Sequence, residues 1–330
     1  MVVAGVILAL VIAGLRTYNQ RAYPITASAQ GDGGGGFDGA SASISPIHGE
    51  YLNGFHLKPE RKQHRGVVVT YGGSEGSANE ARATQLVNAG YEVLALYFFG
   101  QDNQAPTLAN VPLEQFDEVS AYIRDNVADP QPVTVIGASK GAEFALLLAQ
   151  HGFAVDNVVA FAPAHYSYSG LDFSSGQDLP SFTLGGQAVP FASFRDASIG
   201  TGLKMLWQGV TAYPISYRAT YEEAAAKAPQ EARIELSLVD APVVLFAGTA
   251  DSMWQSDVAA EALCASNSSP SANTECHVYP DAGHIFFKDS EAQPGGWELM
   301  LGGTPEGNRA AFEDSERVLA QRLAQWHPPM

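Results

Sequence analysis

Two short stretches of the chain place a serine between glycines in the pattern Gly-x-Ser-x-Gly. They are residues 72–76, with Ser74 at the centre, and residues 137–141, with Ser139 at the centre. In a sharp strand-to-helix turn this pattern leaves the serine Oγ exposed, and the glycines allow neighbouring backbone to approach closely. An exposed serine hydroxyl beside a histidine base can attack a carbonyl carbon. The pattern therefore predicts acyl chemistry at one of the two serines.

The surrounding sequence separates the two copies. Residues 133–136 have the character of a strand that runs straight into Ser139, and helix-forming residues follow it directly. After the first copy, Ser-Ala-Asn-Glu at residues 77–80 fits a capping box. We therefore expect the next helix to begin at about Ser77 and residues 72–76 to form an open glycine-rich loop. Ser139 is the predicted nucleophile.

The glycine-rich loop could also supply donors for the negative oxygen that forms during acyl transfer. Backbone N–H groups of such a loop, and of the residue after the nucleophile, commonly make this oxyanion hole. Here those groups belong to Gly73, Ser74 and Lys140. A simple turn at residues 72–76 is the alternative interpretation.

A histidine that takes the serine proton, and an acid that orients the histidine, should follow the nucleophile in the chain. Asp251 follows one expected strand and His284 follows the next. Asp240 precedes its strand and Asp281 crowds the histidine, so Asp251 is the predicted acid and His284 the predicted base. A turn-forming aspartate and a surface histidine are the alternatives. The remaining histidines lie before the sheet, beside other elements, in a strand or in the tail: His48, His56, His64, His151, His165, His277 and His327.

Strand and helix signals alternate from residue 65 onward. The expected strands are residues 66–71, 91–98, 132–136, 157–161, 242–246 and 276–279. The three consecutive valines at residues 67–69 suit a sheet that is buried on both faces. Alternating strands and helices predict an α/β fold with a mostly parallel sheet flanked by helices. We expect residues 49–58 to supply antiparallel edge strands and residues 47–330 to form one catalytic domain.

One long segment interrupts this alternation. About eighty residues separate the expected strands at 157–161 and 242–246, far more than a usual connection. We expect an inserted lid at about residues 165–232. Its aromatic side chains could line an acyl-sized pocket or pack within the lid itself. They are Tyr166, Tyr168, Phe173, Phe182, Phe191, Phe194, Trp207 and Tyr213.

The N-terminal segment differs in character from the rest. Residues 2–15 are 14 residues without a polar side chain, and Arg16 follows. A membrane span needs about 20 such residues, so this length is typical of a signal peptide or a short signal anchor. Residues 27–45 are rich in Gly, Ser and Ala, which predicts a flexible linker. We expect residues 1–46 to hold an exported protein on the periplasmic or extracellular face of a membrane, with cleavage after the Ala-Ser-Ala triplet at 27–29 as the alternative.

The amino-acid composition argues against some classes of binding partner and cofactor. The formal net charge is −17, from 18 Lys and Arg against 35 Asp and Glu, so nucleic acid is excluded as an expected partner. Two cysteines are too few for a Cys-rich zinc site, and the three candidate catalytic side chains need neither a metal nor an organic cofactor. In an exported protein Cys264 and Cys276 could form a disulfide, and two buried thiols are the alternative. The oligomeric state stays open.

Four separated motifs together resemble a known catalytic domain. They lie at residues 71–76, 137–143, 250–256 and 282–284. In this order they resemble the C-terminal domain shared by acyl-CoA thioesterases and bile acid-CoA:amino acid N-acyltransferases, which is itself similar to dienelactone hydrolases. The resemblance covers roughly residues 60–325.

The resemblance implies an α/β-hydrolase with Ser139 as nucleophile, Asp251 as acid and His284 as base, and with Gly73 and Ser74 on the oxyanion side. Serine at this position is similar to the hydrolytic members, whereas the transferases characteristically carry cysteine. The leading hypothesis is a serine acyl hydrolase that cleaves a small-molecule thioester such as acyl-CoA. The alternatives are an exported carboxylesterase on simple acyl esters, an acyltransferase, and a membrane-tethered binding module without catalysis.

Overall fold

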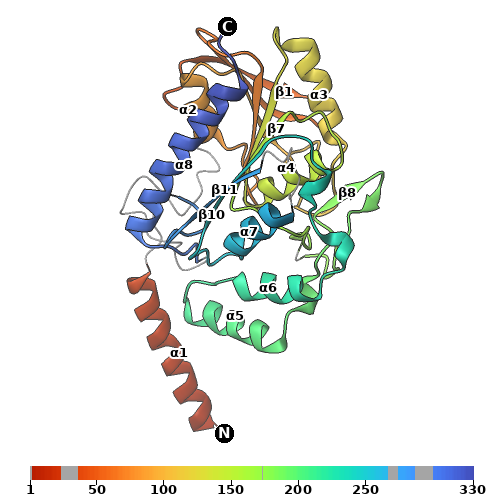
Figure 1. The fold of residues 1–330 in the computed structure, drawn as a ribbon. Coiled ribbons are helices and arrows are strands. Elements are labelled where there is room, and N and C mark those ends of the chain that lie inside the picture. The colour runs from red at the N-terminus through yellow and green to blue at the C-terminus, as the bar shows by residue number, and fades with distance from the viewer. Residues whose placement is uncertain (1, 24–35, 173, 267–273, 287–299) are drawn as a thin grey trace.

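The computed structural model describes residues 2–23, 36–172, 174–266, 274–286 and 300–330. Its centre is an eight-stranded sheet in the order β1-β2-β4-β3-β6-β7-β10-β11 (Figure 1). The strands are β1 Ala42–His48, β2 Asn53–Pro59, β3 Val67–Tyr71, β4 Val93–Tyr97, β6 Val133–Ala138, β7 Asn157–Phe161, β10 Val243–Gly248 and β11 Thr274–Tyr279. From β4 to β11 all neighbours are parallel, and β1 and β2 form an antiparallel edge. The predicted α/β fold is confirmed.

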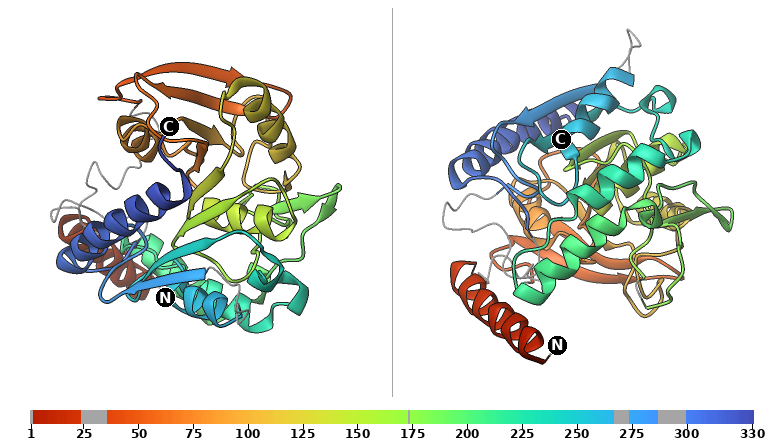
Figure 2. Two further views of the ribbon diagram at one scale, coloured as in Figure 1. Left: turned by 45° about the horizontal axis from the view of Figure 1, so that its top comes forward. Right: turned by 90° about the horizontal axis from the view of Figure 1, so that it is seen from below.

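Helices cover both faces of this sheet (Figures 1 and 2). The helices are α1 Val2–Ala22, α2 Glu80–Asn88, α3 Gln115–Asn126, α4 Lys140–Gln150, α5 Ile199–Thr211, α6 Arg218–Lys227, α7 Ser256–Ser266 and α8 Pro305–Trp326. Helices α3, α4 and α7 pack on one face, and α2 and α8 on the other. Val67 and Val69 face the first core and Val68 the second, because successive strand residues point to opposite faces. This alternation explains why an unbroken valine run is stable here.

Two boundaries differ from the expected ones. β1 begins at Ala42, before the expected domain start at residue 47. Helix α2 begins at Glu80 rather than Ser77, so the predicted capping box is wrong. The Ser77 hydroxyl donates to Glu75 at 2.7 Å, and Asn79 precedes the helix in a left-handed conformation with φ 60°. The Ser77 hydroxyl is therefore bonded to Glu75 and does not cap the helix.

The expected insertion lies between β7 and β10. It holds two short strands, β8 Phe182–Leu184 and β9 Gln187–Ala188, followed by α5 and α6. β8 pairs with β5, Val111–Pro112, which precedes α3 in the body of the domain. The structure thus ties the insertion to the body by strand pairing.

Some aromatic side chains of the insertion pack in a buried cluster, and others line a pocket. Tyr168 and Tyr221 pack with Trp254 in one buried cluster, whereas half-buried Phe194 contacts this cluster and also lines a pocket. Trp207 is exposed on α5. The predicted Phe173 lies outside the described residues.

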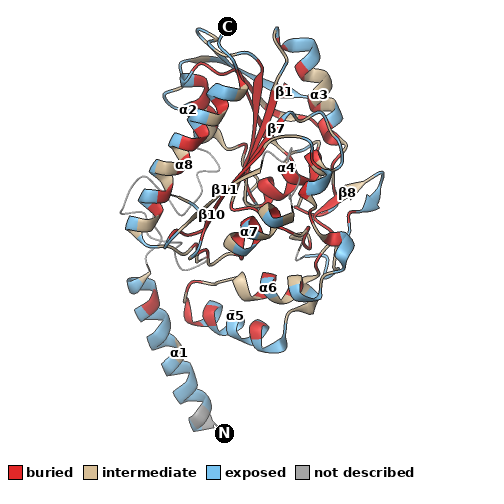
Figure 3. Cartoon of the chain, in the orientation of Figure 1, coloured by how far each residue is buried: buried red, intermediate tan, exposed pale blue. Residues whose placement is uncertain are grey.

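Cys264 and Cys276 form a disulfide that joins the end of α7 to β11, with Cα atoms 6.5 Å apart. At the other end of the chain, α1 lies mostly exposed (Figure 3). Among the described helices none combines the length and apolar character needed to cross a bilayer. The membrane anchor expected from residues 2–15 is therefore not supported.

His327, which follows α8, is buried against β6. Its burial leads us to expect that stability depends on pH. Its buried ring donates from Nδ1 to the Arg65 carbonyl at 2.7 Å and contacts the Thr134 hydroxyl through Nε2 at 2.7 Å. Burial lowers the pKa of His327 to about 4, against an ordinary value near 6.5. Between these values the unfolded chain binds the proton and the folded protein does not, so acid favours unfolding.

We expect the free energy of unfolding to fall as the pH drops from about 6.5 toward 4, with His327 contributing about 2–3 kcal/mol. Burial also lowers the pKa of His165 to about 4, which adds a loss of the same sign. Urea unfolding at a series of pH values measures the loss, and His327→Gln should reduce it. An equal pH dependence in that variant would contradict this role for His327.

Candidate active site

Ser139 occupies a strained turn between β6 and α4. Its φ is +54° and its ψ −119°, a conformation that non-glycine residues rarely adopt. A Cβ on Gly137 would lie 2.1 Å from the Gly141 carbonyl oxygen, and one on Gly141 would lie 2.0 Å from that of Gly72. Both glycines are therefore required, because the turn brings three backbone segments together. Of the two serines at the centre of a Gly-x-Ser-x-Gly pattern, only Ser139 has a positive φ.

The structure brings Ser139, His284 and Asp251 into one hydrogen-bonded row. His284 Nε2 lies 2.9 Å from Ser139 Oγ, and His284 Nδ1 lies 2.8 Å from Asp251 Oδ2. The aspartate and the histidine are buried, with 1% and 7% of their surfaces exposed. When Nδ1 donates to the carboxylate, Nε2 is the ring nitrogen left to accept the serine proton.

Asp251 is fixed by the loop that follows β10. Its Oδ1 accepts backbone N–H bonds from Met253 at 2.9 Å and Trp254 at 3.2 Å, and its Oδ2 accepts the Ser256 hydroxyl at 2.6 Å. These donors hold the orientation of the carboxylate. They leave Oδ2 aimed at the imidazole.

His284 is held by residues that the sequence patterns did not single out. Asn308 of α8 accepts the Gly283 N–H at 2.7 Å, and the His284 N–H donates to the Leu301 carbonyl at 2.8 Å. The Trp254 ring meets the imidazole edge to face, with centroids 5.6 Å apart. The only sequence signal for Trp254 is its place three residues after Asp251, and Asn308 has none, since its contact depends on how α8 folds back.

The three predicted oxyanion residues also meet at this site. A Cβ on Gly73 would lie 3.1 Å from the Ser139 Cβ, so the glycine-rich loop touches the serine. The Lys140 N–H lies in the first turn of α4, where an N–H group has no acceptor within the helix. The Gly73 N–H, however, donates to the Glu75 carboxylate at 2.8 Å. In this conformation Glu75 occupies the donor that an oxyanion would use.

A buried ion pair stands directly beneath the turn. Lys140 Nζ lies 2.8 Å from the Glu143 carboxylate and 2.9 Å from Ser181 Oγ, and both charged side chains are at most 1% exposed. Glu143 also accepts the Tyr168 backbone N–H at 3.0 Å and the Ser167 hydroxyl at 3.2 Å. Burial raises the pKa of Glu143, and the attraction of Lys140 opposes that rise. The pair joins the nucleophile turn to the start of the insertion.

Arg218 joins the insertion to the loop that carries Asp251. From the first turn of α6, its Nη1 donates to the Asp251 carbonyl at 2.9 Å and its Nη2 lies 3.0 Å from the Asp257 carboxylate. Ser216 donates to the Ser252 carbonyl at 2.7 Å. The beginning of the insertion is thus bonded to α4, and its later part to the loop that carries Asp251.

Two cavities lie near the loops that carry the candidate catalytic residues. One of about 340 Å³ lies between the insertion and the catalytic loops. Its lining is mainly apolar: Ser74, Leu171, Phe194, Met205, Tyr217, Thr220, Tyr221 and Met253. A second, of about 130 Å³, adjoins His284 and Ala138 on the side of Arg82. The first cavity borders the loops of Ser74 and Met253, and the second borders His284 and the residue before Ser139.

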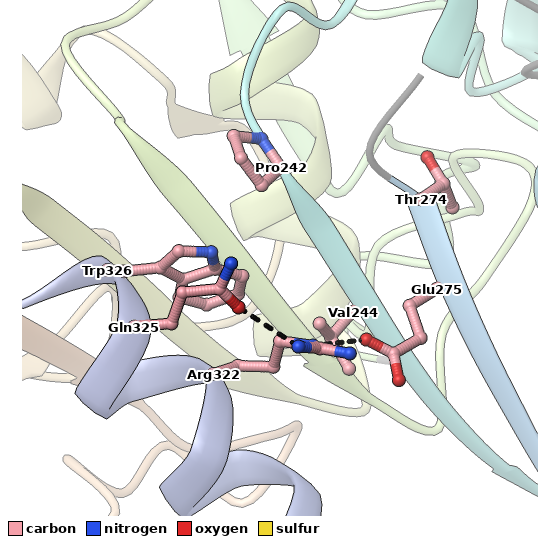
Figure 4. Close-up of a pocket in the computed structure, with 7 residues that line it drawn as sticks. All are labelled: Pro242, Val244, Thr274, Glu275, Arg322, Gln325 and Trp326. Carbon is pink, nitrogen blue, oxygen red and sulfur yellow. Dashed lines mark hydrogen bonds and ion pairs between the residues drawn. The ribbon is translucent and has the colours of Figure 1, made fainter. Parts of the chain in front are cut away.

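A third cavity, of about 390 Å³, lies away from the catalytic residues (Figure 4). It is bordered by the first residues of β10 and β11 and by the end of α8, where Arg322 pairs with Glu275. Asp251 and His284 follow the opposite, carboxyl ends of the same strands. In the described part of the chain, no group of three or more His, Cys, Asp or Glu residues is placed to hold a metal.

The parallel sheet, the strained serine turn after β6 and the histidine after the last strand define an α/β-hydrolase. Residues 111–287, more than half of the chain, match the family described as BAAT / Acyl-CoA thioester hydrolase C terminal. The chain belongs to this family, as its four sequence motifs predicted.

Its relatives include both enzyme types that share this domain. Acyl-coenzyme A thioesterase 6 of Mus musculus is 26% identical over 233 residues, which are 70% of this chain and 50% of the relative. The mitochondrial acyl-coenzyme A thioesterase 2 of Homo sapiens is 22% identical over 272 residues, 80% of this chain and 52% of the relative. Acyl-coenzyme A amino acid N-acyltransferase 1 of Mus musculus is 32% identical, over 31% of this chain and 24% of the relative. The chain spans about half the length of the two thioesterases.

Among solved structures, a putative dienelactone hydrolase from Klebsiella pneumoniae has 17% identity and a TM-score of 0.49, covering 86% of this chain and 97% of that one. The esterase PF2001 of Pyrococcus furiosus has 14% identity and a TM-score of 0.49, covering 86% and 91%.

Proposed function

We propose that the protein is a serine acyl hydrolase that cleaves a small-molecule acyl thioester of the acyl-CoA kind. The observation that carries this proposal is the unbroken hydrogen-bonded row from Ser139 through His284 to Asp251. The family supports an acyl substrate, since its members' names join acyl-coenzyme A thioesterases and N-acyltransferases.

In the proposed reaction, Ser139 Oγ attacks the acyl carbonyl carbon while His284 Nε2 takes its proton. Asp251 keeps the imidazole in the required tautomer and stabilises the imidazolium. The protonated histidine then gives the proton to the leaving sulfur, and an acyl-enzyme ester remains on Ser139. Water, activated by the same Nε2, releases the acid.

The negative oxygen that forms in each step needs donors beside Ser139. We propose the Lys140 N–H and the Gly73 N–H, with Ser74 in the same loop. Because Glu75 holds the Gly73 N–H, its carboxylate must turn away when the oxyanion forms. Neither Ser74 nor Glu75 takes part in the proton transfers.

The apolar cavity of about 340 Å³ is the proposed acyl site. Ligand pockets generally measure about 300–1,000 Å³, so this one suits short and medium chains. We expect Met205→Trp, which fills the cavity from α5, to lower kcat/KM at least about tenfold for medium acyl chains and little for acetyl substrates.

A chain-length series of p-nitrophenyl esters measures this preference. Leu203→Trp is the matched control, because Leu203 lies on the same helix with 60% of its surface exposed. An unchanged chain-length profile in Met205→Trp would place the acyl chain elsewhere.

The leaving group is tested by comparing acyl-CoA with p-nitrophenyl esters of the same acyl chain. A higher kcat/KM for acyl-CoA, lost in Ser139→Ala, is the result expected of a thioesterase. Turnover of the simple esters alone would make the protein a carboxylesterase, and a product that partitions with added amine or alcohol would make it an acyltransferase.

We also propose an exported location for the catalytic domain, which begins with β1 at Ala42 and carries the insertion at about residues 165–232. The disulfide between Cys264 and Cys276 supports it, because such bonds persist in oxidising compartments. Alkylation of unreduced protein taken directly from cells should leave both cysteines unmodified. Labelling of both would contradict an oxidising location.

A further inference from the structure

Helix α5 has its polar and apolar sides reversed. A surface helix normally buries its apolar side and exposes its polar one. In α5 the buried side chains are Thr201, Gln208 and Thr211, each at most 9% exposed. The large apolar side chains point outward: Ile199 (84% exposed), Leu203 (60%), Leu206 (63%), Trp207 (46%) and Val210 (38%). Such a helix is built for surroundings other than water.

The inner side of α5 explains why this reversal is stable. Thr201 Oγ1 donates to Glu223 of α6 at 2.7 Å, and the Gln208 side chain donates to the Pro214 carbonyl at 3.2 Å. Met205 lies between them along the helix and lines the cavity beneath. Thr201 thus bonds the start of α5 to α6, and Gln208 bonds its end to the loop that follows. These contacts hold the polar side of α5 against the insertion.

Helix α1 packs beside the end of α5. Its exposed apolar side chains extend the apolar outer side of α5. Buried Asn19 donates to the Thr211 carbonyl at 2.9 Å, and Tyr23 meets Tyr213 edge to face with centroids 5.1 Å apart. Both helices lie at one end of the molecule (Figures 1 and 2), with exposed outer surfaces (Figure 3). Beyond Arg16 the apolar residues 2–15 project away from the domain.

The exposed side chains of α1 do not form a single stripe. Ile7 and Leu8 are exposed by 57% and 53%, and Leu10 and Val11 by 67% and 48%, although consecutive residues point about 100° apart. A helix that binds a protein groove needs one apolar stripe, whereas lipid surrounds a helix from several sides. The distribution of these side chains favours lipid.

The charges at this end of the molecule are complementary to a phospholipid surface. Residues 1–31 and 197–217 contain no Asp or Glu, although the net charge of the chain is −17. Their charged side chains are Arg16, Arg21 and Lys204, all basic. Basic side chains beside an apolar surface can reach lipid phosphates while the apolar residues enter the acyl region.

We propose that α1 and the outer side of α5 form one docking surface for phospholipid. Docking lays α5 on the lipid and needs no helix to cross it. Because Met205 belongs to the same helix, the apolar cavity then lies next to the lipid. If the cavity is the acyl site, a consequence that rests on the proposed function, acyl chains held in lipid are its nearest substrates.

Vesicle sedimentation of the full chain tests the docking without any use of catalysis. The protein carries Ser139→Ala, so that no lipid is consumed, and the vesicles contain phosphatidylcholine with some phosphatidylglycerol. We expect the protein to sediment with the vesicles. The double variant Leu203→Glu/Leu206→Glu should lower the partition coefficient about tenfold or more, because each leucine loses its apolar burial in lipid.

Leu238→Glu is the matched control, since Leu238 is 63% exposed on a short 3-10 helix outside this surface, and it should bind as the parent does. Unaltered turnover of p-nitrophenyl acetate, measured with Ser139 restored, shows that the α5 variant is folded. No sedimentation of the parent, or equal sedimentation of the α5 variant, would overturn the proposal. So would a dimer of the parent that the α5 substitutions dissociate in the absence of vesicles, because the surface would then bind a second copy.

Discussion

Ser139→Ala is expected to lower kcat on acyl-CoA or p-nitrophenyl esters by about 10⁴- to 10⁶-fold, with little change in KM. The variant keeps the cavity and the backbone donors, so substrate binding survives. It removes the atom that would form the acyl-enzyme, and His284 then has no serine proton to accept. Removing a member of such a triad leaves only the catalysis due to binding and the oxyanion donors.

Ser74→Ala is the matched control for this experiment, because Ser74 is the central serine of the other Gly-x-Ser-x-Gly copy. It lines the proposed acyl cavity but lies outside the hydrogen-bonded row of Ser139 and His284. We expect its kcat to stay within about tenfold of the parent, since an oxyanion loop acts through its backbone. A larger loss in Ser74→Ala than in Ser139→Ala would exchange the roles assigned to the two serines.

Lys140→Met is expected to destabilise the protein by about 3–5 kcal/mol. Lys140 and Glu143 are both buried, 2.8 Å apart, and the substitution leaves the Glu143 carboxylate without its cation. An uncompensated buried charge costs more than a lost surface contact. Urea unfolding measures the loss as a lower midpoint.

The double variant Lys140→Met/Glu143→Gln separates the charge from the packing. A glutamine still offers an oxygen to the Tyr168 N–H and the Ser167 hydroxyl, and it carries no charge. We expect the double variant to recover more than half of the free energy of unfolding that is lost in Lys140→Met. Equal destabilisation of both variants would show that the methylene packing of Lys140, and not its charge, matters.

The parallel core and the candidate catalytic residues could be predicted because both depend on local sequence. The consecutive valines of β3 predicted burial on both faces, and Ser139, Asp251 and His284 each follow a strand directly. Since carboxyl ends of parallel strands meet at one edge of a sheet, residues far apart in the chain were expected to converge there. The structure places His284 within hydrogen-bond distance of both Ser139 and Asp251.

Features set by individual side-chain contacts could not be predicted. The capping box at Ser77 failed because Glu75 takes its hydroxyl. Asn308 supports the loop of His284 only because α8 returns to it. The reversed sides of α5 follow from its hydrogen bonds to neighbours in the insertion, which no helical periodicity reveals.

The most direct test of the proposed function is to identify the residue that a reactive acyl mimic modifies. The full chain is treated with a fluorophosphonate, which phosphonylates an activated serine, and its peptides are sequenced by mass spectrometry. We expect one phosphonyl group per chain, on Ser139, and none after His284→Ala, because the serine then lacks its base. Modification of Ser74 with Ser139 unmodified, or labelling of Ser139 that persists in His284→Ala, would contradict the assignment of Ser139, His284 and Asp251 as the catalytic residues.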